Sequence, residues 1–298
     1  MLKFFKTRGI AIALAMTLPA LTGCFVHVRR VPRARMPKTI LSSTAEQLSS
    51  LINQRYDQIH SMSAQVTFQL TEGGILKGKE KTYASFSGYV LMRKPGDIRV
   101  IGFLPVIHSQ AFDMASDGKN FTMIIPPKNK AFAGTNQVTH ESTKPLENLR
   151  PYIFFDSLLI QSISPTDLVV LTADTKTVIT PKHKHIDILP EYLLTILRRK
   201  SLDSNVLVPE RVIHFDRATL EPYEEDIYDP QGSVETEATF GPLKIFDGQE
   251  FPSYITIRRP LQEYQILVTF QKIHFNLNLT DDQFHVKIPQ GMPVKELH

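Results

Sequence analysis

The 298-residue chain has one cysteine, Cys24, no tryptophan and only 14 glycines. A single cysteine excludes a disulfide within the chain and a zinc site built from several thiolates. The sequence also lacks a Gly-x-Ser-x-Gly elbow, a phosphate-binding glycine loop and a His-Glu-x-x-His helix. His183 and His185 have strand spacing, but lysines alternate with them and oppose a metal ion. We therefore predict no enzyme activity, no cofactor and no metal.

Acidic residues are absent from the first 38 positions, which hold eight of the 34 basic residues. Residues 39–298 therefore contain 26 basic and 30 acidic side chains, so the sequence pI of about 9.0 comes from the N-terminal stretch. A nucleic-acid-binding surface requires Lys and Arg clustered on the folded domain. We therefore expect no nucleic acid among the partners.

A hydrophobic run long enough to cross a membrane is missing as well. The apolar stretch from Gly9 to Gly23 has 15 residues and is interrupted by Pro19, whereas a spanning helix needs about 20. A cationic start precedes this stretch, and small residues end it, which is the layout of a secretory signal. We predict that residues 1–23 are a signal peptide.

The end of that signal, Leu21-Thr22-Gly23-Cys24, resembles the bacterial lipobox. The resemblance implies cleavage before Cys24 and lipidation of its thiol, so that the membrane is a partner through a lipid anchor. The alternative is a buried structural cysteine in an ordinary signal or anchor segment. Phe25, rather than Asp, follows the cysteine, which favours the outer membrane on its periplasmic face.

Residues 24–42 are predicted to be the lipid anchor and a basic tether. From Phe25 to Ser42 the chain has two prolines, five cationic side chains and no apolar periodicity. Cations close to a lipid anchor would meet anionic headgroups, at about 1 kcal/mol each. A solvated linker that happens to be basic is an equal alternative.

Residues 43–298 are predicted to form the folded domain. Ser43 is the expected N-cap of a helix, with Glu46 completing a capping box, and apolar residues follow at helical spacing from Leu48 to Ile59. Beyond it the period becomes two, as in half-buried strands, with Phe284–Ile288 as the last strand. Prolines 145 and 151 indicate short helices within Pro145–Gln161.

We thus expect a mainly β (α+β) fold: a curved antiparallel half-barrel of about ten or eleven strands, with an N-terminal helix and mid-chain lid helices. A sheet of that width must curl, split or close. The acidic run Glu224-Glu225-Asp226 is interpreted as a solvated turn. Residues 168–248 are either an enlargement of this sheet or a small second domain.

Apolar residues at alternating strand positions are the candidate lining of an apolar cavity. Two interpretations stay open, because periodicity does not separate a filled core from an open groove that takes acyl chains. The candidates are Val66, Phe68, Val90, Met92, Phe112, Met114, Ile255, Ile257, Val268 and Phe270.

The stretch from Gly88 to Gly134 resembles the LolA/LolB-type carriers and receptors of lipoproteins. The matching features are a basic-proline turn (Lys94-Pro95-Gly96), Arg99 on the next strand, Pro105 at its end, and an Asp117-Gly118 turn. The Phe284–Gly291 segment resembles the end of related proteins. The resemblance implies a half-barrel lidded by helices, whose cavity binds acyl chains of lipids or lipoproteins, with a periplasmic carrier protein as a further partner.

The same resemblance implies candidate lid and loop residues. Arg93 and Lys94 precede the turn proline, where carriers place a basic side chain against the lid. Leu104 and Val106 belong to the best candidate for an exposed apolar loop, and the alternative is that they are core at the end of a strand. The expected function is the placement of lipoproteins or lipids in the outer membrane. The alternatives are an outer-membrane lipoprotein that acts through protein contacts, and an envelope-stress regulator with a carrier-like domain.

Overall fold

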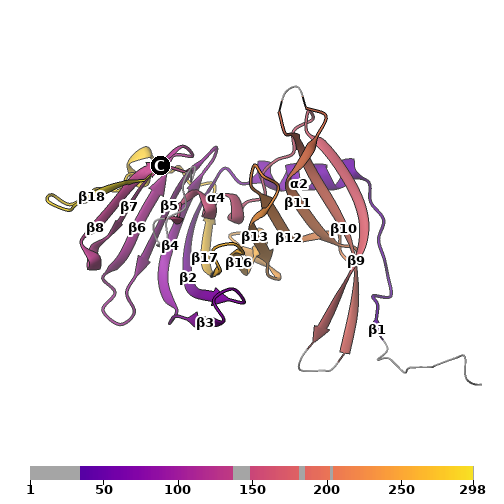
Figure 1. Cartoon of the computed structure of the whole chain (residues 1–298), viewed down its shortest axis with the longest axis horizontal. Coiled ribbons are helices and arrows are strands. Elements are labelled where there is room, and N and C mark those ends of the chain that lie inside the picture. Colours follow the sequence, from indigo (N-terminus) through magenta and orange to yellow (C-terminus); the bar gives the residue numbers. More distant parts are fainter. Residues whose placement is uncertain (1–33, 137–147, 181–184, 202–203, 298) are drawn as a thin grey trace, which may run out of the picture. The chain divides into compact units, whose positions relative to one another are not determined.

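The computed structural model of the chain describes residues 34–136, 148–180, 185–201 and 204–297 (Figure 1). Cys24, the lipobox-like residues Leu21, Thr22 and Gly23, and the first part of the basic tether, up to residue 33, lie outside these residues, as does His183. The signal peptide, the lipid anchor and the boundaries at residues 23 and 42 therefore stay predictions.

The chain divides into two compact units. The smaller comprises Met1–Met36 and Thr177–Ile188, and the larger comprises Pro37–Lys176 and Leu189–His298. Within the smaller unit, β1 (Ala34–Arg35) pairs in parallel with the start of β10 at Ile186 and Asp187. Both helices and the candidate site belong to the larger unit.

Among the described residues of the larger unit, strands dominate, together with two helices and two short 3-10 turns. Their bounds are α2 (Ala45–Gln58), β2 (Ser61–Gly74), β3 (Lys79–Thr82), β4 (Phe86–Arg93), β5 (Asp97–Phe103), β6 (Gln110–Ser116), β7 (Asn120–Ile125), η2 (Pro126–Lys128), β8 (Lys130–Thr135), α4 (Tyr152–Leu158), β9 (Leu168–Thr180), β10 (His185–Arg199), β11 (Leu207–Asp216), β12 (Glu221–Tyr228), β13 (Val234–Phe240), β14 (Leu243–Phe246), β15 (Gln249–Pro252), β16 (Tyr254–Arg259), β17 (Tyr264–Phe275), η3 (Asp281–Phe284) and β18 (Val294–Leu297).

The strands form one wide open sheet in the order β10-β11-β12-β13-β16-β17-β2-β4-β5-β6-β7-β8-β18, while β3 pairs with β2 and β9 with β10. Neighbours from β10 to β8 are antiparallel, and β18 joins β8 in parallel. The predicted class, a mainly β fold with an open antiparallel sheet and few helices, is confirmed. With β1, which pairs with β10, sixteen described strands share the sheet, more than the ten or eleven expected.

Helix α2 begins one residue later than predicted. Its N-cap is Thr44, whose hydroxyl accepts from the Gln47 backbone N–H while the Gln47 side chain accepts from the Thr44 N–H. This is the reciprocal capping box expected, with Gln47 in place of Glu46. The helix buries Leu48 and Ile52 against an apolar cluster that includes Leu194, on β10, which agrees with the predicted apolar face.

Helix α4 begins directly after Pro151 and lies against β5, β13 and β16 (Figure 1). Its side chains Phe154, Phe155 and Leu158 are buried in the main apolar core. None of the described helices has the length and apolarity needed to cross a bilayer.

Two sequence interpretations are wrong. Glu224–Asp226 is not a solvated turn but part of strand β12, whose Glu225 is buried. Phe284–Ile288 is not a strand: η3 ends at Phe284, and the residues after it have no regular structure.

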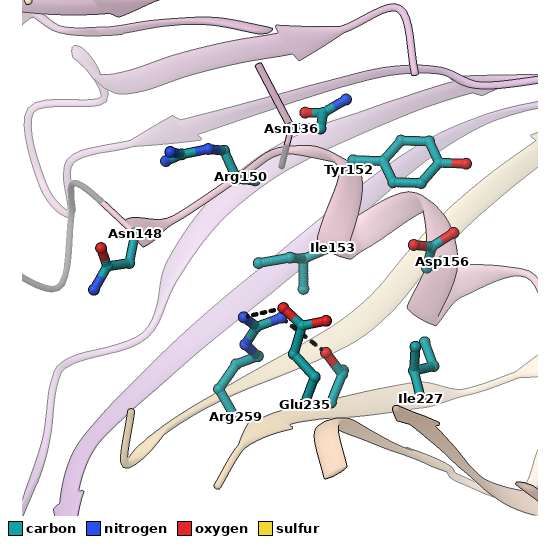
Figure 2. A pocket seen from close by; sticks show the side chains of 10 residues that line it. Asn136, Asn148, Arg150, Tyr152, Ile153, Asp156, Ile227, Glu235 and Arg259 are labelled. Carbon is teal, nitrogen blue, oxygen red and sulfur yellow. Dashed lines mark hydrogen bonds and ion pairs between the residues drawn. The ribbon is translucent and has the colours of Figure 1, made fainter. Parts of the chain in front are cut away.

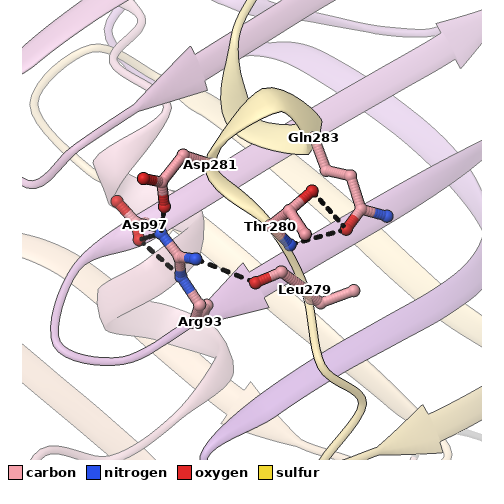
Figure 3. Close-up of polar contacts among 6 residues, drawn as sticks. All are labelled: Arg93, Asp97, Leu279, Thr280, Asp281 and Gln283. Atoms are coloured by element: carbon pink, nitrogen blue, oxygen red, sulfur yellow. Dashed lines mark hydrogen bonds and ion pairs between the residues drawn. The ribbon is translucent and has the colours of Figure 1, made fainter.

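The segment around Phe284 is held by arginines instead of a strand partner. Figure 3 shows the Arg93 guanidinium donating to the carboxylates of Asp97 and Asp281 and to the carbonyl of Leu279. Arg99 donates to the carbonyl of Gln283 in the same way. Val286 then buries its side chain in a small apolar cluster beside the sheet. Of the alternating residues Phe284, Val286 and Ile288, only Val286 is buried, and Ile288 is 37% exposed.

Candidate functional site

An apolar cavity of about 430 Å³ is the candidate site. Strands β2, β4, β5, β6, β7 and β17 contribute its lining, and Phe154 of α4 with the preceding Leu149 contributes the helical side. Two charged residues, Glu72 and Lys128, occur among the lining residues, and the rest are apolar or tyrosine. A volume in the range of about 300–1,000 Å³ with an apolar lining is typical of small-molecule sites.

Four phenylalanine rings form one side of the cavity. Phe68 lies 5.4 Å from Phe86, 6.3 Å from Phe112 and 6.1 Å from Phe154 between ring centroids, and Phe86 and Phe112 are 5.9 Å apart and edge-to-face. Such pairs contribute about 0.5–1.5 kcal/mol each beyond the area they bury. These contacts fix the rings in place and so define a stable wall.

Two glycines directly opposite each other allow the rings to lie close to the sheet. Gly88 of β4 pairs with Gly102 of β5. A Cβ atom at Gly88 would lie 2.6 Å from Cε2 of Phe68, and one at Gly102 would lie 2.4 Å from Cε1 of Phe112. Any other residue at Gly102 would have to displace the Phe112 ring, and one at Gly88 would meet both the Phe68 ring and the backbone oxygen of Ile101, 2.3 Å away.

The ten predicted cavity residues all lie in or against one apolar core. Three of them line the cavity, namely Phe68, Phe112 and Met114. The other seven are buried but do not line it: Val66, Val90, Met92, Ile255, Ile257, Val268 and Phe270. The sequence analysis missed lining residues on other elements, above all Leu149, Phe154 and Tyr264.

The predicted loop residues lie at one end of this cavity. Leu104 lines it together with Pro105, whereas Val106, two residues further on, is 89% exposed. The loop between β5 and β6 is thus apolar and partly exposed.

The two basic residues before Pro95 have different contacts. Lys94 donates from Nζ to the carbonyl of Tyr56, 2.7 Å away, and its ammonium lies 3.7 Å from the centroid of the Tyr56 ring. It therefore contacts the last turn of α2, and its partial burial there lowers the pKa of Lys94. Arg93 contacts the C-terminal segment instead (Figure 3).

A second, polar cavity of about 480 Å³ borders the other side of α4, where Tyr152 and Asp156 line it with residues of β10, β11 and β12. A smaller polar pocket adjoins the same two residues; Figure 2 shows Arg259 of its wall paired with Glu235 at 2.8 Å. Helix α4 thus has its phenylalanines toward the apolar core and Asp156 toward polar surroundings.

Two carboxyl groups in the polar cavity have raised pKa values because the protein shields them from solvent. Burial raises the pKa of Asp156 to about 7, and the neighbouring charge of Glu225 adds to the effect. Burial also raises the pKa of Glu225 to about 7, although Arg211 lies 3.4 Å from it. Shifted carboxyl pKa values of this kind occur at functional sites and in structural networks alike.

A candidate cation cluster lies on β11 and β12, where His214, Glu224 and Asp226 place ligand atoms within 4.8 Å of one another. Its donors are already engaged: Lys176 pairs with Glu224 at 2.9 Å and Glu191 pairs with His214 at 3.0 Å. Burial opposes the charged imidazole, but the carboxylates of Asp226 and Glu191 outweigh it and raise the pKa of His214. The Lys176 ammonium and the His214 imidazole therefore already pair with the carboxylates that a cation would need.

Comparison with known proteins identifies a shared fold but no activity. No family model and no curated protein matches the chain. Among solved structures, a DUF1329 family protein from Desulfovibrio piger matches 81% of this chain and 95% of its own, with 13% identity and a TM-score of 0.50. The chain shares its fold with that protein.

Two further solved structures are similar at low identity. A LolA superfamily protein from Nitrosomonas europaea matches 82% of this chain and 99% of its own, with 12% identity and a TM-score of 0.48. A domain from Vibrio parahaemolyticus, described as an outer membrane lipoprotein-sorting protein, matches 81% of this chain and 97% of its own, with 11% identity and a TM-score of 0.45.

Proposed function

We propose that the chain is a lipid-anchored protein of the cell envelope that binds acyl chains in its apolar cavity and helps to place lipoproteins or lipids in the outer membrane. The observation that carries the proposal is the cavity of about 430 Å³ lined by Phe68, Phe86, Phe112 and Phe154. Burial of an acyl chain in such a lining gains about 0.8 kcal/mol per methylene before the cost of ordering the chain.

The proposal requires binding and release but no covalent step. Transfer of cargo would follow the difference in affinity between a donor, this cavity and an acceptor. The class of cargo comes from the sequence resemblance of Gly88–Gly134 to lipoprotein carriers and receptors, and from the lipobox-like Leu21–Cys24. A purely structural lipoprotein, the second candidate, has no use for an open cavity.

Filling the cavity should abolish acyl binding. Ala111 lines the cavity, so Ala111→Trp places an indole where the ligand would lie. We expect affinity for the fluorescent fatty acid cis-parinaric acid to fall about tenfold or more, since displacing only two methylenes costs about 1.6 kcal/mol. Ile245→Trp, on exposed β14, adds the same side chain elsewhere and should bind normally.

The outcome of this titration separates the two candidates. Saturable binding by the original chain and by Ile245→Trp, lost in Ala111→Trp, supports the acyl-binding proposal. Absence of fatty-acid uptake by the original chain, together with no lipid in the mass spectrum of detergent-free protein, would leave the structural role. Thermal unfolding of all three proteins checks that each is folded.

The lipid anchor is tested on the one cysteine of the chain. We expect the N-terminal peptide of membrane-extracted protein to begin at Cys24 and to carry the mass of a lipid. Cys24→Ser should abolish incorporation of radioactive palmitate, because no other thiol is present to replace it. An unmodified peptide, or one that begins before Cys24, would refute the anchor and leave the cavity proposal untouched.

A further inference from the structure

The tip of the β2–β3 hairpin presents two apolar side chains to solvent. Ile75 is 99% exposed and Leu76 is 79% exposed, and they follow the Gly73-Gly74 pair at the end of β2. Single exposed apolar residues are common on protein surfaces, but adjacent ones at the end of a projecting hairpin are a feature of contact sites.

The tip is held in this conformation by its neighbour, the β16–β17 turn. The carboxylate of Glu263 accepts hydrogen bonds from the backbone N–H groups of Leu76, at 2.5 Å, and Lys77, at 3.0 Å. The Lys77 ammonium donates to the carbonyl of Gln262 at 3.1 Å. The two apolar side chains are therefore presented by a fixed backbone, which reduces the entropy lost on contact with a partner.

The hairpin tip lies at one end of the strands. At this edge of the sheet, polar residues and a loop line the apolar cavity. Glu72 and Tyr83, at the base of the hairpin, are hydrogen-bonded at 2.8 Å and line the cavity. Because neighbouring strands are antiparallel, the β5–β6 loop and the β16–β17 turn end at this same edge. Those two connections add exposed apolar residues, namely Val106, Ile107 and Leu261.

The charges at this edge fit an anionic surface. Lys77, Lys79 and Lys81 follow the apolar tip, and Lys128 lines the cavity. Three acids lie among them, Glu72, Glu80 and Glu263, so the four lysines leave this edge with a net charge of +1. Each lysine near an anionic bilayer contributes about 1 kcal/mol, in addition to the burial of Ile75 and Leu76.

We propose that the β2–β3 hairpin docks on an anionic lipid surface, with Ile75 and Leu76 inserted among the acyl chains and the lysines at the headgroups. The cavity edge then meets the bilayer, and an acyl chain passes between them without crossing water. The purpose of docking, which is the passage of an acyl chain, rests on the proposed function. The docking itself is measured independently of acyl binding.

The absence of tryptophan makes the hairpin directly observable. Ile75→Trp places the only indole of the full chain at the tip. On vesicles of phosphatidylglycerol and phosphatidylethanolamine we expect its emission to shift to shorter wavelength and to be quenched by lipids brominated in the acyl chains. Ile245→Trp is the matched control, because β14 packs, through Phe251 of its partner β15, beside Phe270 and Phe275 toward the other end of β17. Its indole should stay in water.

The fluorescence of Ile75→Trp reports how deep this one side chain lies in the bilayer, so a lipid on Cys24 does not affect the result. In the second arm, Ile75→Glu with Leu76→Glu should weaken vesicle binding of unanchored protein about 100-fold or more, as two buried apolar side chains are lost. Equal emission from the Ile75→Trp and Ile245→Trp proteins on vesicles would overturn the inference.

The two proposals fail in distinguishable ways. If the Ile75→Trp indole stays in water on vesicles while cis-parinaric acid still binds, the docking inference fails and the acyl-binding proposal stands. If the indole is quenched by brominated lipid while the fatty acid does not bind, docking stands and the acyl-binding proposal fails.

Discussion

Replacement of Arg99 by methionine is expected to lower the free energy of unfolding by about 3–5 kcal/mol. The Arg99 guanidinium donates to both carboxylate oxygens of Asp113, at 2.9 and 2.7 Å, and the Asp113 side chain is only 4% exposed. Removal of the arginine leaves a buried carboxylate without its cation and also releases the carbonyl of Gln283. Urea denaturation at neutral pH measures the loss.

Two further variants test whether the loss of stability comes from the buried charge of Asp113. The double variant Arg99→Met with Asp113→Leu should recover most of the loss, because the cost lies in the uncompensated charge and not in the missing pair. Arg258→Met breaks a pair of similar length, 2.8 Å to Glu237, but Arg258 is 54% exposed, so we expect a loss below about 1 kcal/mol. Equal losses in Arg99→Met and Arg258→Met would show that the burial of Asp113 has no energetic consequence.

Replacement of Asp156 by asparagine is expected to stabilise the protein by about 2–4 kcal/mol at pH 8 and to have little effect at pH 4. The pKa of Asp156 is raised from 3.8 to about 7, mainly by burial. The folded protein therefore binds this proton more tightly than the unfolded chain does. The contribution of the protonated carboxyl is fully present below pH 3.8 and is lost as the pH rises to about 7, since a charge must then be kept out of water.

The test is the difference in unfolding free energy between Asp156→Asn and the original chain at several pH values. This difference should grow from about pH 4 to about pH 7 and be constant above about pH 8. Glu210→Gln is the matched control, because Glu210 lines the same cavity but is exposed. A lower stability of Asp156→Asn at pH 8, or a difference that does not change with pH, would contradict the burial argument.

Local patterns predict the elements that depend on neighbours in sequence. Leu48 and Ile52 have helical spacing and are buried under α2, and the Asp117-Gly118 turn forms because the Asp117 carboxylate accepts from the backbone of Lys119 and Asn120. Alternation also places Val66 and Phe68 on the buried face of β2. Alternation does not indicate which of the two borders a cavity, since both point to the same face.

The remaining features depend on partners that are distant in sequence. Three acids in a row are usually solvated, which predicts a turn at Glu225, but Arg211 on the neighbouring strand reaches its carboxylate. Alternation predicts a strand from Phe284, but the segment is held by Arg93 and Arg99, nearly two hundred residues earlier. Gly88 and Gly102 carry no signal individually, because the rings that lie against them, Phe68 and Phe112, come from β2 and β6.

The facing glycines Gly88 and Gly102 lower the stability of strands β4 and β5, but they leave room for the rings of Phe68 and Phe112. Glycine inside a strand costs about 0.5–1 kcal/mol relative to alanine, so β4 and β5 each give up some stability at this point. An alanine at Gly102 would regain it only by displacing the ring of Phe112, and one at Gly88 would also meet the backbone oxygen of Ile101 at 2.3 Å. The position of the phenylalanine rings relative to the sheet therefore depends on two backbone positions that leave no room for a single methyl group.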